Sequence, residues 1–117
     1  MLFRSNDHPN YGQSTNDTFP TAMRVMSRVM LEDLIGAVER LEGAFAAKGE
    51  EFDGILKSGR THLQDATPVT LGQEFSGYAA QLEQSRLGLE SALPGLYRLA
   101  IGGTAVGTGL KIGRAHV

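Results

Sequence analysis

Large apolar residues recur every three or four positions over two long stretches of the chain, and a polar segment separates them. The first stretch runs from Phe19 to Leu56 and the second from Leu71 to Leu96. Steps of this size place side chains on one face of an α-helix. The pattern therefore predicts two long helices. The first, at about Asp17–Leu56, would be roughly 60 Å long at about 1.5 Å per residue.

The first predicted helix has one apolar stripe, formed by Phe19, Met23, Met26, Met30, Leu34, Val38, Leu41 and Phe45. Its opposite face carries the charged residues Arg24, Arg28, Glu32, Glu39 and Lys48, which predicts a solvated side. A helix this long cannot bury its stripe against one partner helix alone. We expect it to need further helices, from elsewhere in the protein or from other subunits.

Local signals set the predicted ends of the helices. Asn16 or Asp17 is a candidate N-cap of the first helix, with Pro20 in its first turn. Pro94 and Gly95 could kink or interrupt the second helix. Between the two helices, residues 58–70 break the periodicity and indicate a polar loop. The fold class that follows is all-α, a hairpin of two long helices.

Composition narrows the class of partner. The formal net charge is -2 and the basic residues do not cluster, so the chain lacks the electrostatic footprint of a nucleic-acid binder. No apolar run approaches the length of a membrane span. The chain has no cysteine, which excludes disulfides and thiolate metal sites and is compatible with a reducing compartment. We therefore expect neither nucleic acid nor membrane as a partner, and a cytoplasmic location.

The first polar motif runs from Asn6 to Asp17 and ends at the predicted start of the first helix. Ser14, Thr15 and Asn16 lie where unpaired backbone N–H groups and the positive end of the helix dipole favour a carboxylate or phosphate. The same residue types are ordinary helix caps. Local spacing alone leaves both interpretations open.

The second polar motif lies between the helices and is centred on His62. A histidine near its free pKa is the usual general acid or base at neutral pH. Asp65 or Glu74 could orient its ring, while Thr61 and Arg60 could hold a substrate oxyanion. A surface loop with one structural histidine is the alternative. No zinc-binding pattern such as HExxH is present, and we expect no metal or cofactor.

The third motif, Gly102–Leu110, is rich in glycine and threonine. It lacks the GK[ST] ending of a phosphate-binding loop, and no predicted strand precedes it. Its glycines would let the backbone approach a ligand closely, or would simply form a flexible loop at a helix end.

Together, and in this order, the segments Gly12–Ala22, Gly59–Glu74 and Gly102–Leu110 resemble the fumarase/aspartase superfamily. The resemblance implies homotetramers built on a central bundle of long helices, with each active site formed by residues from three subunits. It also implies elimination of water, ammonia or a larger amine from a succinyl-type substrate, giving fumarate. The helical hairpin would then be part of that central bundle.

The resemblance assigns roles to the residues that match the superfamily's motifs. Ser14, Thr15 and Asn16 would bind a substrate carboxylate. Thr61 and His62 would lie at the reacting centre, contacting substrate and serving catalysis. Removing a proton beside a carboxylate builds a doubly charged aci-carboxylate, which hydroxyls, amides and helix N–H groups can stabilise without a metal.

Two further residues, Asn6 and Asp7, match the superfamily's secondary dicarboxylate site. The His-Pro pair expected before them is replaced by Arg4 and Ser5. The superfamily's base lies on a Gly-Ser-Ser loop that has no counterpart in this chain. We therefore expect the isolated chain to be inactive.

Within the superfamily, Thr61–Pro68 and Ala100–Ala105 are most like the class II fumarase branch, which interconverts L-malate and fumarate. Aspartate ammonia-lyase is the alternative, although many members carry Gln where His62 stands. A helical oligomerisation module without chemistry is a further alternative, because amphipathic stripes alone would suit it.

Both ends of the chain look foreign to this pattern. Ile112–Val117 resembles one reading frame of a common short-read sequencing adapter, and Leu2–Ser5 resembles its reverse complement. We expect residues 1–5 and 111–117 to be non-native ends and residues 6–110 to be a partial central helical lyase domain.

Overall fold

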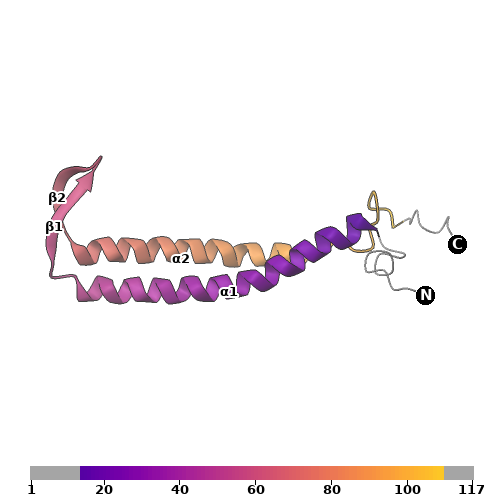
Figure 1. Cartoon of the computed structure of the whole chain (residues 1–117), viewed down its shortest axis with the longest axis horizontal. Coiled ribbons are helices and arrows are strands. Elements are labelled where there is room, and N and C mark those ends of the chain that lie inside the picture. Colours follow the sequence, from indigo (N-terminus) through magenta and orange to yellow (C-terminus); the bar gives the residue numbers. More distant parts are fainter. Residues whose placement is uncertain (1–13, 110–117) are drawn as a thin grey trace, which may run out of the picture. The chain divides into compact units, whose positions relative to one another are not determined.

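The structure, a computed structural model, describes residues 14–109. The elements in chain order are α1 (Thr15–Glu51), β1 (Leu56–Thr61), β2 (Gln64–Thr70) and α2 (Leu71–Leu96) (Figure 1). The predicted class, a hairpin of two long helices, is confirmed. Asn6 and Asp7 and the predicted non-native ends at 1–5 and 111–117 lie outside the described residues.

The segment between the helices is a two-stranded antiparallel ribbon, so the prediction of a polar loop was wrong. Thr and Val, which favour strands, recur along β2 and outweigh the polarity of the segment. The pairing runs from Leu56 with Thr70 at the base to Thr61 with Gln64 at the turn. A bulge interrupts the ladder opposite Gly59, where a Cβ would lie 2.7 Å from the Thr67 carbonyl oxygen.

The helix ends differ from the prediction. The first helix begins at Thr15 rather than Asp17 and ends at Glu51 rather than Leu56. Pro20 consequently lies inside α1 rather than in its first turn, and it removes the N–H that would bond the Asn16 carbonyl. The second helix continues through Pro94 to Leu96.

Two compact units divide the described chain, residues 14–30 with 93–109 and residues 31–92. In the second unit, the end of α1 and the start of α2 are joined by backbone hydrogen bonds. Leu71 N–H donates to the Ile55 carbonyl at 2.7 Å and Gly72 N–H donates to the Phe52 carbonyl at 3.0 Å. These bonds satisfy N–H groups of the first turn of α2 that have no partner inside the helix.

A capping box also closes the start of α2. The Thr70 hydroxyl accepts from Gln73 N–H, and the Gln73 side-chain oxygen accepts from Thr70 N–H, both at 3.0 Å. The ribbon therefore ends directly in a well-defined helix start.

Glycine allows α1 and α2 to approach closely beside this junction. A Cβ built on Gly72 would lie 2.4 Å from the Gly49 carbonyl oxygen and 2.6 Å from the Asp53 Cα. Next to this contact, four aromatic rings from α1, the turn after it and α2 pack at centroid distances from 5.4 to 5.9 Å: Phe45, Phe52, Phe75 and Tyr78.

Half-buried positions in the second unit alternate in steps of three and four, as in a coiled coil. On α1 and the turn after it they include Leu31, Ile35, Val38, Glu42, Phe45 and Phe52, together with the buried Gly49; on α2 they include Phe75, Ala79, Leu82, Arg86 and Leu89. Arg86 bridges the helices, because its guanidinium donates to Glu42 and to Glu90 at 2.9 Å each.

Much of the predicted stripe of α1 is exposed in the described chain, most of all in its first half. Met23, Met26 and Met30 are 51%, 60% and 62% exposed. In the first unit the inward face is instead the one that carries Arg24 and Arg28, which the sequence predicted to be solvated.

Arg24 and Arg28 bind the end of α2 and the residues after it. Arg24 Nη1 donates to the Gly95 carbonyl at 2.9 Å and also to the Arg98 carbonyl. Arg28 Nε donates to the Tyr97 hydroxyl at 2.9 Å, and its guanidinium carbon lies 5.5 Å from the Tyr97 ring centroid. Arg24 thus satisfies carbonyls at the end of α2, where the backbone lacks internal partners, while Arg28 holds the Tyr97 side chain.

No hydrophobic side chain of the described residues is buried. The expectation that α1 cannot cover its apolar positions with one partner helix is consistent with this exposure. In residues 14–109, neither helix combines the length and the apolar character of a membrane span.

Candidate functional site

The start of α1 is closed by the Ser14 carbonyl. It accepts from Asp17 N–H and Thr18 N–H at 3.0 Å each, and from the Thr18 hydroxyl at 3.1 Å. Asn16 and Asp17 lie in the first turn, so the prediction that one of them is the N-cap was wrong. Thr15 and Asn16 are exposed at this positive helix end, where an anion is favoured.

The first and third sequence motifs meet here. Asp17 Oδ1 accepts from Thr104 N–H at 2.6 Å, and Asn16 Nδ2 donates to the Ala105 carbonyl at 3.3 Å. Asp17 is only 8% exposed and is the one buried polar residue of the described chain. Local sequence predicts Asp17 only as a candidate cap, and no local spacing could reveal a contact with Thr104.

The loop that Asp17 holds has a backbone suited to glycine. Gly102, Gly107 and Gly109 have φ of 88°, 84° and 76°, in the left-handed region that other residues rarely adopt. Thr104 shares that region with φ of 59°. Gly103 N–H donates to the Ala100 carbonyl and Gly109 N–H to the Gly103 carbonyl, both at 3.2 Å. The loop is therefore a specific turn structure and not only a flexible helix end.

Thr61 and His62 lie at the tip of the ribbon. His62 and Leu63 form its two-residue turn with φ of 49° and 61°. A turn with positive φ at both central residues fits the twist of a hairpin but normally uses Asn and Gly. Two side chains other than Gly in this conformation carry backbone strain, which is frequent at functional sites.

The two groups of predicted site residues belong to different compact units of the chain. Ser14, Thr15 and Asn16 belong to one compact unit, and Thr61 and His62 belong to the other. Among the described residues, no hydrogen bond joins the two groups.

The two carboxylates proposed to orient His62 have other partners. Asp65 Oδ1 accepts from Arg60 Nε at 3.3 Å. Glu74 accepts from the Lys57 ammonium and, through its other oxygen, from the Tyr78 hydroxyl at 2.8 Å. The hydrogen bond from Lys57 and, to a smaller extent, the one from Tyr78 lower the pKa of Glu74. The bond to Glu74 in turn raises the pKa of Tyr78. The expected carboxylate–histidine pairing was therefore wrong.

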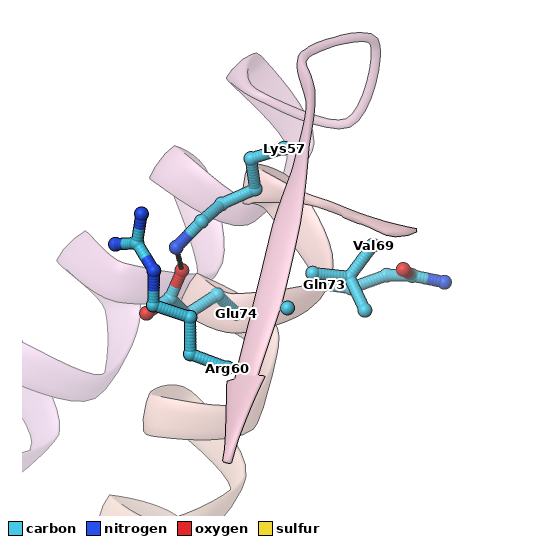
Figure 2. A pocket seen from close by; sticks show the side chains of 6 residues that line it. Lys57, Arg60, Val69, Gln73 and Glu74 are labelled. Atoms are coloured by element: carbon cyan, nitrogen blue, oxygen red, sulfur yellow. Dashed lines mark hydrogen bonds and ion pairs between the residues drawn. The ribbon is translucent and has the colours of Figure 1, made fainter. Parts of the chain in front are cut away.

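A cavity of about 410 Å³ lies beside this ion pair, between the ribbon and the start of α2. Figure 2 shows the Lys57 ammonium next to the Glu74 carboxylate, while Val69 and Gln73 lie on the other side of the strand. Within residues 14–109, no group of three or more His, Asp or Glu residues is arranged to hold a metal ion. The donors that the site offers are hydroxyls, amides and backbone N–H groups, which suit a carboxylate.

Comparison with known proteins agrees with this architecture and these motifs. A sequence family described as lyase matches residues 2–117, so the chain belongs to that lyase family. Within it, the chain is similar to the class II fumarases of the fumarase/aspartase superfamily.

The relatives make this similarity specific. The class II fumarate hydratase of Bordetella parapertussis is 59% identical over 107 residues, which are 91% of this chain and 23% of that protein. A mitochondrial fumarate hydratase of Dictyostelium discoideum is 56% identical over 111 residues, 94% of this chain and 23% of that protein.

A solved structure shares the fold as well. The recombinant class II fumarase of Schistosoma mansoni has a TM-score of 0.76 and 47% identity, covering 93% of this chain and 23% of that one. The chain thus spans about a quarter of the length of the proteins it resembles.

Proposed function

We propose that the protein containing this segment is a class II fumarate hydratase, which reversibly eliminates water from L-malate to give fumarate. The observation that carries the proposal is the 59% identity to a class II fumarate hydratase over nearly the whole chain. The contact between Asp17 and Thr104 supports it, because it joins two of the three matching motifs at a helix start suited to a carboxylate.

In this proposal Ser14, Thr15 and Asn16 bind a carboxylate of the substrate. Loss of the proton beside a carboxylate forms the aci-carboxylate, whose second negative charge needs fixed donors. Donors that are already oriented before reaction cost no reorganisation when the charge develops. The Asp17 contact fixes the Gly102–Gly109 loop beside the helix start and so supports such an arrangement.

Thr61 and His62 act at the reacting centre in the same proposal, and Asn6 and Asp7 contribute to a secondary dicarboxylate site. The two groups of site residues lie in different units of one chain. A homotetramer would supply Thr61 and His62 of one subunit to the helix start of another. The exposed methionines of α1 support assembly, since a large exposed apolar face marks an interaction surface.

The test is an assay of the complete protein that contains this segment on L-malate and on L-aspartate. We expect fumarate from malate and none from aspartate. Fumarate and ammonia from aspartate alone would replace the proposal with an aspartate ammonia-lyase. A well-folded complete protein that acts on neither would favour a helical module without chemistry. Fractionation of cells that produce it tests the proposed cytoplasmic location.

Residue roles can be tested in a chimera in which residues 6–110 replace the aligned segment of the Bordetella parapertussis relative. We expect this chimera to form fumarate from L-malate. Replacing His62 with Asn should lower kcat by about 10²-fold or more, as for loss of an acid–base or orienting group. A chimera that assembles like its parent but loses nothing on this substitution would contradict the role of His62.

A further inference from the structure

The orientation of the β1–β2 ribbon depends on the contacts at its base, where the two strands join the helices. A two-stranded hairpin alone is marginally stable in water. In the described residues the ribbon has no third strand, and most of its side chains are exposed. Whatever fixes the ribbon to the helices therefore also fixes the turn at its tip.

Side-chain hydrogen bonds from the ribbon to the rest of the described chain come from two residues, one on each strand. Thr70, the last residue of β2, bonds with Gln73 and with Asp53. On β1, Lys57 donates to Glu74 at the start of α2, and both residues line the cavity (Figure 2). Both partners of this pair are 34% exposed, so water screens them only in part.

Glu74 is itself held by a second contact. Its other oxygen accepts from the Tyr78 hydroxyl at 2.8 Å. The Tyr78 ring packs against Phe45 of α1 and Phe75 of α2, with centroids 5.7 and 5.9 Å away. A continuous set of contacts thus connects the aromatic cluster of the two helices to strand β1.

We propose that Glu74 is a positioning residue for Thr61 and His62, acting through Lys57 to fix the ribbon on α2. The inference rests on the proposed function, in which these two residues contact substrate at the reacting centre. Glu74 touches neither of them. The Arg60–Asp65 pair ties the two strands together next to the turn and passes the constraint to the tip.

The distance from this contact to the turn makes the contact important. Lys57 and His62 are five residues apart, which is roughly 16 Å along a strand. A tilt of about 5° at the base would move the turn by about 1 Å, and misplacing a reacting group by about 1 Å can cost about 10²-fold in rate. A modest weakening at Glu74 should therefore be visible in catalysis.

The experiment compares Glu74→Gln with a matched control, Glu51→Gln, in the chimera. Glu51 also pairs with a lysine, Lys48, at 2.5 Å, but both residues lie on α1 and do not connect it to the ribbon. We expect Glu74→Gln to lower kcat by about 10-fold or more while KM changes by less than about 3-fold, because orientation rather than affinity is lost. Glu51→Gln should leave both constants unchanged.

Two further readouts separate positioning from general destabilisation. Lys57→Met should lower kcat like Glu74→Gln, and the double variant should lower it no further, since both act through one contact. Hydrogen exchange of the ribbon amides should rise in these variants while that of α2 stays constant. Equal kcat in Glu74→Gln and Glu51→Gln, or multiplicative effects in the double variant, would overturn the proposal. An inactive unsubstituted chimera would count against the proposed function, while the exchange result would still test the anchoring.

Discussion

Asp17 accepts a hydrogen bond from Thr104 N–H at 2.6 Å, across 87 positions of sequence. The carboxylate belongs to the first turn of α1, and the N–H belongs to the glycine-rich loop after α2. Asp17 is 8% exposed, so water does not readily take its place as the acceptor of this hydrogen bond. This contact orders the loop beside the helix start that carries Ser14, Thr15 and Asn16.

Replacing Asp17 with Ala should lower the stability of the 117-residue chain by about 1.5–3 kcal/mol, because it leaves a partly buried N–H without its charged acceptor. Asp17→Asn keeps an acceptor oxygen and should cost less. Thermal unfolding followed by circular dichroism measures both. Asn16→Ala is the control, with an expected change within about 0.5 kcal/mol since Asn16 is exposed. Equal midpoints for Asp17→Ala and Asn16→Ala would contradict the role of Asp17.

The periodicity of the sequence predicted two long helices. The prediction is clearest for α2, where most apolar residues follow one helical pattern. It misjudged α1, since that helix has apolar residues on two faces and only tertiary contacts decide which one turns inward. Arg24 and Arg28 show the reason. Arg24 bonds the backbone carbonyls of residues 95 and 98, and Arg28 bonds Tyr97, about seventy positions away in the sequence. Local pattern carries no information on such partners.

The candidate site was predictable as motifs but not as geometry. Ser14, Thr15, Asn16, Thr61 and His62 stood out by residue type and by resemblance, and their roles stay proposals. The ribbon that carries His62 was missed because its turn lacks the Asn-Gly signal that usually marks a two-residue hairpin. The partners of Asp65 and Glu74 depend on the strand pairing and could not be assigned without it.

The strained turn offers a second prediction. Leu63 has φ of 61° and is 93% exposed, so it pays a conformational cost without packing in return. Leu63→Gly should stabilise the 117-residue chain by about 0.5–1 kcal/mol, less than the full left-handed cost of about 1–2 kcal/mol because Gly also gains freedom on unfolding. Leu63→Val should destabilise it, since a branched Cβ fits this region worse. Thermal midpoints in the reverse order would show that Leu63 makes a stabilising contact.

Acid should weaken the anchor of the ribbon. The hydrogen bonds from Lys57 and Tyr78 lower the pKa of Glu74 from its ordinary value of 4.5. Because the folded pKa lies below the unfolded one, the stabilisation is present above about pH 4.5 and is lost as the pH falls through the folded value. The difference in thermal midpoint between the unsubstituted chain and Glu74→Gln should therefore shrink on acidification. A difference that stays constant down to strongly acidic pH would show that the charge of Glu74 does not contribute.

Close approach of the helices at Gly72 gives a prediction with an internal control. A Cβ there would lie 2.4 Å from the Gly49 carbonyl oxygen. That oxygen belongs to the backbone of α1, so it cannot rotate away as a side chain could. Gly72→Ala should destabilise the 117-residue chain by about 1–3 kcal/mol or more, as overpacking does. Gly77→Ala lies in the same helix with nothing within 4 Å of the added carbon, and should stabilise by about 0.5–1 kcal/mol. If both substitutions shift the thermal midpoint equally, the close contact is absent in solution.

The isolated chain should be inactive and prone to self-association. Its site residues lie in two separate units, and the chain spans only about a quarter of the length of its relatives. No described hydrophobic side chain is buried, and Phe19, Met26 and Met30 are each at least 60% exposed. Light scattering should show association that grows with concentration, since exposed apolar surface drives it. The double variant Met26→Gln with Met30→Gln should reduce association and leave helix content unchanged. The control Glu39→Gln should leave association as it is. Fumarate formed from malate by the purified chain would contradict the need for further sequence.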